Sequence, residues 1–168
     1  MIAKDADLIS REDLMKELFY CPSSGHFTWL RRSGARNIGQ RAGNTNFHGY
    51  IRIQVRGRSF LAHRLAWLIG HGEWPNGEID HLNGDRLDNR LCNLRDGSHS
   101  ANNQNKRIPQ RNNRSGYLGV FPHNGGWTAA ISVNRKNHYL GTFADPKEAH
   151  AAYLAAKARL HPFSEITK

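Results

Sequence analysis

The sequence has few cysteines and no long apolar run. Its two cysteines, Cys21 and Cys92, belong to no C-x-x-C pair, so neither a zinc ribbon nor a disulfide framework is indicated. We therefore expect both as reduced thiols in a cytosolic protein. No apolar stretch approaches the length of a membrane span, and residues 1–5 lack the apolar core of a signal peptide. We expect no membrane partner and no small-molecule cofactor.

Acidic residues are absent from residues 18–72. The whole chain of 168 residues holds 24 Lys and Arg against 14 Asp and Glu, a net charge of +10. A solvated surface normally mixes charges of both signs. An acid-free run rich in arginine instead predicts a surface that faces phosphate groups, with nucleic acid as the partner. The arginines of this run are Arg31, Arg32, Arg36, Arg41, Arg52, Arg56, Arg58 and Arg64.

Hydrophobic periodicity and turn residues predict short elements in the first part of the chain. A helix is expected over residues 10–19 with Ser10 as its N-cap and Leu14, Leu18 and Phe19 on one side. A strand follows at 26–30, and residues 33–48 read as a basic loop. A β-hairpin turns at Arg56-Gly57, and a short helix spans residues 63–69. The polar face of the hairpin carries Arg52, Arg56 and Arg58.

Residues 78–105 combine a carboxylate, an imidazole and several amides at fixed intervals. We predict short antiparallel strands at 78–81 and 93–96 around a polar loop, followed by a helix that begins at Ser98 and carries Asn102. Phosphodiester hydrolysis requires an activated water, a Lewis acid and stabilisation of the leaving oxygen. Asp80 and Asn102 offer oxygen ligands suited to Mg²⁺ or Mn²⁺, and His81 offers a base.

Adjacent side chains of a strand point to opposite faces, so Asp80 and His81 share one phosphate only if the strand end is distorted. Asn93 is positioned to bond the backbone across the loop and so to fix the direction of His81. His99, three residues before Asn102, is a rival metal ligand.

The intervals from Asp80-His81 to Asn93 and Asn102 resemble the HNH nuclease motif, in the His-Asn-Asn form of phage and intron-encoded homing endonucleases. The resemblance covers about residues 10–107. It implies a ββα-metal fold in which His81 is the general base, Asp80 and Asn102 bind the metal, and Asn93 holds the loop. The founding motif has His at the last position, and Asn102 in its place disfavours zinc. The surrounding segments that share the resemblance are 49–50, Gly57, 63–67, 72–75, 83–85, 88–90 and 93–95.

Residues 103–114 hold four cations and one aliphatic side chain and are typical of a linker. Strands are expected at 117–121, 127–133 and 138–143, and a helix from Pro146 with Asp145 as its N-cap. This pattern resembles the Apetala-type (ethylene-response-factor) DNA-binding domain, which lays a three-stranded sheet in the major groove. Arginines that this family uses are replaced here by Leu118, Phe121 and Ser132, so other residues are the candidate contacts. They are Arg114, Trp127, Thr128, Arg135, Lys136 and Tyr139.

The sequence therefore predicts an α+β protein with a nuclease module at 1–107, a linker at 108–114 and a domain at 115–162 made of a three-stranded antiparallel sheet packed on one helix. The predicted function is a metal-dependent homing endonuclease that cuts double-stranded DNA to 5′-phosphate and 3′-hydroxyl ends. Arg64 joins the hairpin arginines as a predicted DNA contact.

Two alternative functions and the oligomeric state stay open at this stage. One alternative is a non-catalytic DNA-binding regulator with a vestigial HNH fold, and a weaker one is an RNA-binding or RNA-cutting protein. A monomer would nick one strand, whereas a homodimer could cut both. The resemblance implies a place in the cytoplasm of a bacterial host cell.

Overall fold

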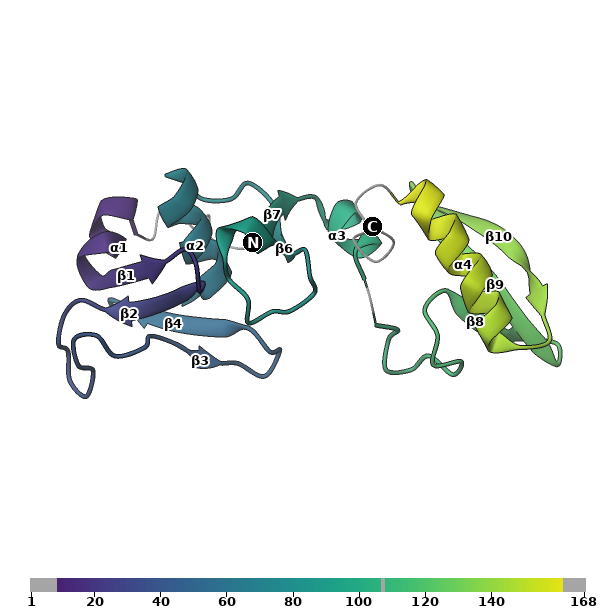
Figure 1. Cartoon of the computed structure of the whole chain (residues 1–168), viewed down its shortest axis with the longest axis horizontal. Helices are drawn as coiled ribbons and strands as arrows, with labels where there is room; N and C mark the ends of the chain where they lie inside the picture. Colours follow the sequence, from purple (N-terminus) through teal and green to yellow (C-terminus); the bar gives the residue numbers. More distant parts are fainter. Residues whose placement is uncertain (1–8, 107, 162–168) are drawn as a thin grey trace. The chain divides into compact units, whose positions relative to one another are not determined.

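The computed structural model describes residues 9–106 and 108–161. They form two compact units, one ending at Gly97 and the other beginning at Ser98. Both units combine helices with antiparallel strands (Figure 1), which confirms the α+β class. Within the described ranges, no helix has the length and hydrophobicity that a membrane span requires. Because the boundary lies at 97/98, the segment expected as a linker, 108–114, falls within the second unit.

The first unit opens with α1 (Arg11–Glu17), which Ser10 caps by accepting a hydrogen bond from Asp13 N at 3.1 Å. The expected helix over residues 10–19 is wrong at its end, because the chain turns into strand β1 (Leu18–Cys21). β1 pairs antiparallel with β2 (His26–Trp29) through a short turn. Leu18 is buried and Phe19 is exposed, which is the alternation of a strand. Aromatic residues before a tight turn favour strand pairing over a further helical turn.

Strands β3 (Asn44–Thr45), β4 (Ile51–Val55) and β5 (Arg58–Leu61) form an antiparallel sheet in that order. β3 lies in the segment that the sequence predicted as a basic loop. The turn between β4 and β5 is Arg56-Gly57, with positive φ at both residues, which matches the right-handed twist of a hairpin. Helix α2 (Ala62–His71) follows and ends at Gly72, whose φ of 83° closes the helix in the left-handed region.

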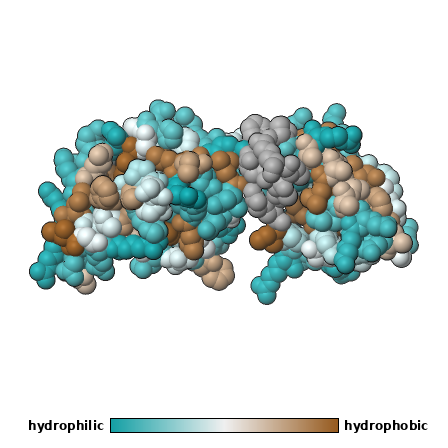
Figure 2. Space-filling view, in the orientation of Figure 1, coloured by the Kyte–Doolittle hydropathy of each residue, from teal (hydrophilic) through white to brown (hydrophobic). Residues whose placement is uncertain are grey.

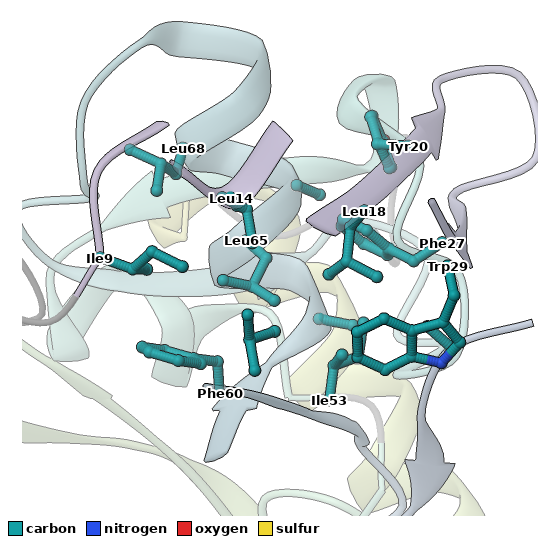
Figure 3. Packing of buried hydrophobic residues seen from close by; sticks show 14 of the residues in the cluster. Ile9, Leu14, Leu18, Tyr20, Phe27, Trp29, Ile53, Phe60, Leu65 and Leu68 are labelled. Atoms are coloured by element: carbon teal, nitrogen blue, oxygen red, sulfur yellow. The ribbon is translucent and has the colours of Figure 1, made fainter. Parts of the chain in front are cut away.

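The hydrophobic core of this unit lies between the helices and the strands (Figure 3). Leu14 of α1, Ile53 of β4 and Leu65 of α2 are fully buried and belong to one cluster. Because β4 buries Ile53 and Val55, its alternate residues Arg52 and Gln54 face solvent. The packing of the core therefore decides which side chains of the sheet are available to a partner.

Strands β6 (Glu78–His81) and β7 (Leu94–Gly97) pair antiparallel close to the expected ranges, with the short 3₁₀ helix η2 (Leu91–Asn93) before β7. Ile79 and Leu94 are buried in the same core cluster. They anchor both ends of the polar loop that runs between the two strands.

The second unit contains α3 (His99–Gln104), strands β8 (Val120–His123), β9 (Gly126–Val133) and β10 (Lys136–Phe143), and α4 (Pro146–Leu160). The strands form an antiparallel sheet in the order β10-β9-β8. Asp145 caps α4 by accepting a hydrogen bond from Lys147 N at 2.7 Å. Ala129 and Ile131 of β9 are buried in clusters with residues of α4, so alternate residues of β9 form the open face of the sheet.

Candidate active site

Asp80 and His81 are neighbours on β6 but lie on opposite faces of the β6–β7 ladder. The register pairs Asp80 with Arg95 and His81 with Leu94, without a shift. His81 is 5% exposed, whereas Asp80 is half-buried. The strand-end distortion that would let both side chains act on one phosphate is therefore absent from this described pair, and alternation alone sets their directions.

Asn89 is the hydrogen-bond partner that orients the His81 imidazole. His81 Nε2 lies 3.3 Å from Asn89 Oδ1, and Asn89 Nδ2 donates to the carbonyl of Leu87 at 3.2 Å. A backbone carbonyl only accepts, so it requires the amide nitrogen, which leaves the amide oxygen for His81. That oxygen also only accepts, so Nε2 carries the proton. In the neutral ring Nδ1 is then the nitrogen that accepts a proton.

Asn89 is itself fully buried and held from the other side by the β1–β2 hairpin. Tyr20 Oη donates to the carbonyl of Asn89 at 2.8 Å. Gly25, at φ 73°, packs so closely that a Cβ there would lie 2.6 Å from Arg90 N and 2.7 Å from Asn89 C. A larger residue at position 25 would therefore push the Asn89 backbone and, with it, the imidazole partner.

Asn93 braces the loop that follows His81. Its Oδ1 accepts from Asn83 N at 2.9 Å, its Nδ2 donates to Asp88 O at 2.8 Å, and its own carbonyl accepts from Leu82 N at 2.9 Å. These bonds tie both ends of the loop to the start of β7. Asn93 therefore acts on the loop, whereas the bond to the imidazole comes from Asn89.

Burial lowers the pKa of His81 from its ordinary value, against the Asn89 hydrogen bond and the carboxylates of Asp80, Asp85 and Asp88, which raise it. The Asp88 side chain is paired with Arg90 at 2.6 Å, and this bond lowers its pKa to about 2. The loop after His81 is thus held by a charged pair that persists over the whole range of neutral and mildly acidic pH.

His63 and Tyr50 surround the His81 ring, and neither was predicted from the sequence. The His63 ring centroid lies 5.1 Å from that of His81, edge to face, and the Tyr50 centroid lies 6.0 Å from it. His63 Nδ1 has no hydrogen-bond partner among the described residues. Burial, aided by the charges of His81 and Arg64, lowers the pKa of His63 to about 3. In the sequence, the signals for these residues were the segments that share the family resemblance: 63–67 contains His63, and 88–90 contains Asn89.

We expect His63 to make the stability of the first unit depend on pH. Its folded pKa of about 3 lies below the ordinary 6.5, so the folded form gains no stability from this group above pH 6.5. Between about pH 6.5 and 3 the unfolded chain binds a proton that the folded chain rejects. The free energy of unfolding therefore falls by up to about 1.4 kcal/mol per pH unit of acidification.

The variant His63→Phe should remove the part of the pH dependence of the unfolding free energy that comes from His63. Denaturant unfolding at a series of pH values from neutral to mildly acidic measures this dependence. His71→Phe, which changes an exposed imidazole on the same helix, is the matched control and should keep the wild-type slope. An unchanged slope in His63→Phe would show that His63 does not carry the effect.

The predicted metal ligand Asp80 is engaged by a cation. Arg95 Nη2 lies 2.9 Å from Asp80 Oδ2, and both side chains are largely buried. The carboxylate has a second oxygen, so its hard oxygen donor set suits Mg²⁺ or Mn²⁺ even with Arg95 in place. Among the described residues, no group of three or more His, Cys, Asp and Glu side chains could hold a metal by itself.

Asn102 lies on α3, in the second unit. Its pairing with Asp80 therefore remains a proposal based on their spacing in the sequence. The side chain of His99, the rival ligand, lies outside the described residues.

A polar groove crosses the outer face of the β3–β4–β5 sheet. It has a volume of about 450 Å³, and no Asp or Glu lines it. Three arginines contribute to it: Arg36, whose guanidinium lies 4.4 Å from the Trp29 ring centroid, Arg41 and Arg52. Stacking on the indole orders the Arg36 fork and leaves its edges to bind an anion. The remaining lining residues are Gln40, Gly43, Asn44, Thr45, Asn46, Gln54 and Ser59.

The arginines predicted to bind DNA differ in what they contact. Arg52 and Arg58 are exposed, and Arg64 donates to the carbonyl of Gly77 at 3.1 Å. Arg56 binds Asp13 at 2.9 Å and Glu17 at 3.4 Å. Its charge is thus partly offset by two carboxylates of α1, and its role as a DNA contact stays a prediction.

In the second unit, Arg114, Arg135, Lys136 and Tyr139 are exposed as a DNA contact requires. Thr128 lies on the open face of the sheet, 3.3 Å from the Thr142 hydroxyl. Trp127 instead packs against the core cluster of Val120, Ala129 and Ala149. The residue is only partly buried, and its role as a DNA contact stays a prediction.

Residues 60–104 match the model of a family described as HNH endonuclease. The match includes His81, Asn93 and Asn102 and supports an HNH nuclease, whose substrate is DNA. None of the curated proteins and none of the solved structures compared with the chain matches it.

Proposed function

We propose that the protein is a metal-dependent DNA endonuclease of the homing type, which hydrolyses phosphodiester bonds to 5′-phosphate and 3′-hydroxyl ends. The observation that carries the proposal is the buried His81 imidazole, which Asn89 holds with its proton on Nε2, inside the region that matches the HNH family. In a ring held in this tautomer, Nδ1 is the nitrogen that can accept a proton. His81 therefore takes the proton of the attacking water.

Asp80 and Asn102 are the proposed ligands of the divalent ion, through a carboxylate and an amide oxygen. When bound, a divalent ion would neutralise charge on the phosphate and stabilise the leaving oxygen. Because Asp80 and His81 point to opposite faces of a regular strand, the end of β6 would have to distort on binding for the ion and the base to act on one phosphate. The chain itself supplies the direction of the carboxylate, since Arg95 opposite Asp80 fixes one of its oxygens at 2.9 Å. Asn93 holds the loop that carries the residues around the base.

Binding of duplex DNA is proposed to involve two surfaces. In the first unit, the groove with Arg36, Arg41 and Arg52 offers cations without a nearby carboxylate among its lining residues, as contact with a phosphate backbone requires. Arg58 on β5 and Arg64 on α2 are further candidates. In the second unit, the proposed contacts are Arg114, Thr128, Arg135, Lys136 and Tyr139, which would locate the cleavage site.

A cleavage assay tests this proposal directly. Purified protein is incubated with supercoiled plasmid and with genomic DNA in Mg²⁺ or Mn²⁺, and the ends formed are mapped by run-off sequencing. We expect nicked or linear products with 5′-phosphate ends that disappear when a chelator is added. Absence of any product from all of these substrates, with either ion, would overturn the enzyme assignment.

The second candidate function is a DNA-binding regulator without catalytic activity. The Asp80–Arg95 ion pair favours it, because a cation already holds one oxygen of the proposed metal ligand. This candidate predicts DNA binding that neither a chelator nor Asp80→Ala alters. A cleavage product under any of the conditions above would exclude it.

The Arg95→Gln variant should lower the Mg²⁺ concentration needed for half-maximal nicking by severalfold. Glutamine keeps a hydrogen-bond donor opposite Asp80 but removes a positive charge that repels the ion. Arg159→Gln, which removes an exposed arginine of α4, is the matched control and should leave the Mg²⁺ requirement near wild type. An unchanged or higher requirement in Arg95→Gln would show that Arg95 does not compete with the ion.

A further inference from the structure

The turn between β3 and β4 presents one aromatic ring to solvent. Phe47 is 99% exposed, more than any other large hydrophobic residue among those described. Isolated exposed hydrophobic residues are common, and on the face seen in Figure 2 they lie scattered among hydrophilic ones. Exposure alone therefore does not identify a binding residue, and the contacts of the turn that carries the ring must be considered.

The turn that carries Phe47 is held in one shape by its own hydrogen bonds. Asn46 Oδ1 accepts from His48 N at 2.9 Å and from Tyr50 N at 3.0 Å. The Asn46 backbone also donates to Tyr50 O at 2.8 Å, and Gly49 N donates to Asn46 O at 2.9 Å. The backbone beneath the ring is thus ordered before any partner binds, which reduces the entropy lost on binding.

The same turn is joined to the active site. Arg86, in the loop after His81, donates from Nη1 to the carbonyl of His48 at 2.7 Å. Its guanidinium also lies 4.8 Å from the centroid of the Tyr50 ring, which in turn packs beside His81. Phe47 therefore stands at the rim of the site that holds the base.

The arginine-lined groove leads up to this turn. Asn44, Thr45 and Asn46 line the groove, and Phe47 is the next residue. A nucleic-acid backbone bound by Arg36, Arg41 and Arg52 would bring its bases against the Phe47 ring. His81 is only 5% exposed, so a local deformation of the duplex would ease the approach of a phosphate to it.

We propose that Phe47 is a wedge that inserts between adjacent base pairs of duplex DNA beside the cleavage site and opens the stack there. The inference rests on the proposed function, because it takes duplex DNA as the ligand. Apolar side chains inserted at a base step unstack it and bend the duplex, and phenylalanine is among the residues used this way. The deformation would bring the backbone within reach of the His81 base.

DNA unwinding measures such insertion without cleavage. Relaxed circular plasmid is incubated with the full chain in chelator, treated with a type I topoisomerase that needs no metal, and stripped of protein. We expect wild-type protein to leave a shift in linking number that Phe47→Ala loses and Phe47→Leu retains in part. Phe19→Ala, which removes another exposed phenylalanine of the first unit, is the matched control and should keep the wild-type shift.

Plasmid binding by each variant is measured in the same buffer by gel shift. Equal linking-number shifts for wild type and Phe47→Ala, or no shift for a wild type that binds, would overturn the wedge. So would a wild type that does not bind plasmid, which would point to a protein partner for the ring instead. If wild-type protein unwinds plasmid but does not nick it in Mg²⁺, the proposed function is contradicted and the wedge role of Phe47 is not. The two failures are therefore distinguishable.

Discussion

His81→Ala should bind DNA like wild type and nick plasmid roughly 10²- to 10⁴-fold more slowly, the usual contribution of a positioned general base. The imidazole is buried in the first unit and is oriented by Asn89. Removing it leaves the attacking water without a proton acceptor. The rate is measured at saturating protein and Mg²⁺, so that binding does not mask the chemical step.

His26→Ala, on β2, is the matched control for this substitution, and its nicking rate should stay near wild type. Thermal unfolding of both variants shows whether the fold is kept, because loss of a buried ring also leaves a cavity. If a folded His81→Ala protein nicks DNA as fast as wild type, His81 is not the base.

Asn89→Leu should lower the nicking rate by roughly 10- to 100-fold, the usual effect of losing a residue that orients a catalytic group. Leucine has a similar volume but offers no acceptor to His81 Nε2 and no donor to the Leu87 carbonyl. The imidazole then loses its preference for one tautomer, so Nδ1 is less often the acceptor. The lost hydrogen bonds should also reduce the free energy of unfolding by about 1–3 kcal/mol, so rates are compared well below the melting temperature.

Asn89→Asp separates orientation from mere packing. The carboxylate keeps an acceptor for His81 Nε2, so the nicking rate of Asn89→Asp should lie between those of wild type and Asn89→Leu. The ¹⁵N shifts of the His81 ring report the tautomer, and wild type should carry its proton on Nε2. A wild-type ring with the proton on Nδ1, or equal rates for the two variants, would contradict the positioning role of Asn89.

Local patterns predicted most of the secondary structure near the site. The cap at Ser10, the turn at Arg56-Gly57 and the strands around residues 78–97 follow from residue types and spacing that act within a few positions. The predicted helix failed beyond Glu17 because pairing with β2, a contact with residues further along the chain, outweighed the helical pattern at Leu18.

By itself, then, the sequence determined the resemblance to the nuclease motif, the α+β class and the order of most elements, since these depend on spacing and periodicity, but it missed β1 and β3. Only the tertiary structure placed Asn89, His63 and Tyr50 around His81 and gave Arg56 its carboxylate partners in α1. Periodicity predicts which face of a helix or strand is buried, but it does not predict which other element packs against that face. The partners of a buried base and of a surface charge come from segments far apart in the chain, so packing alone decides them.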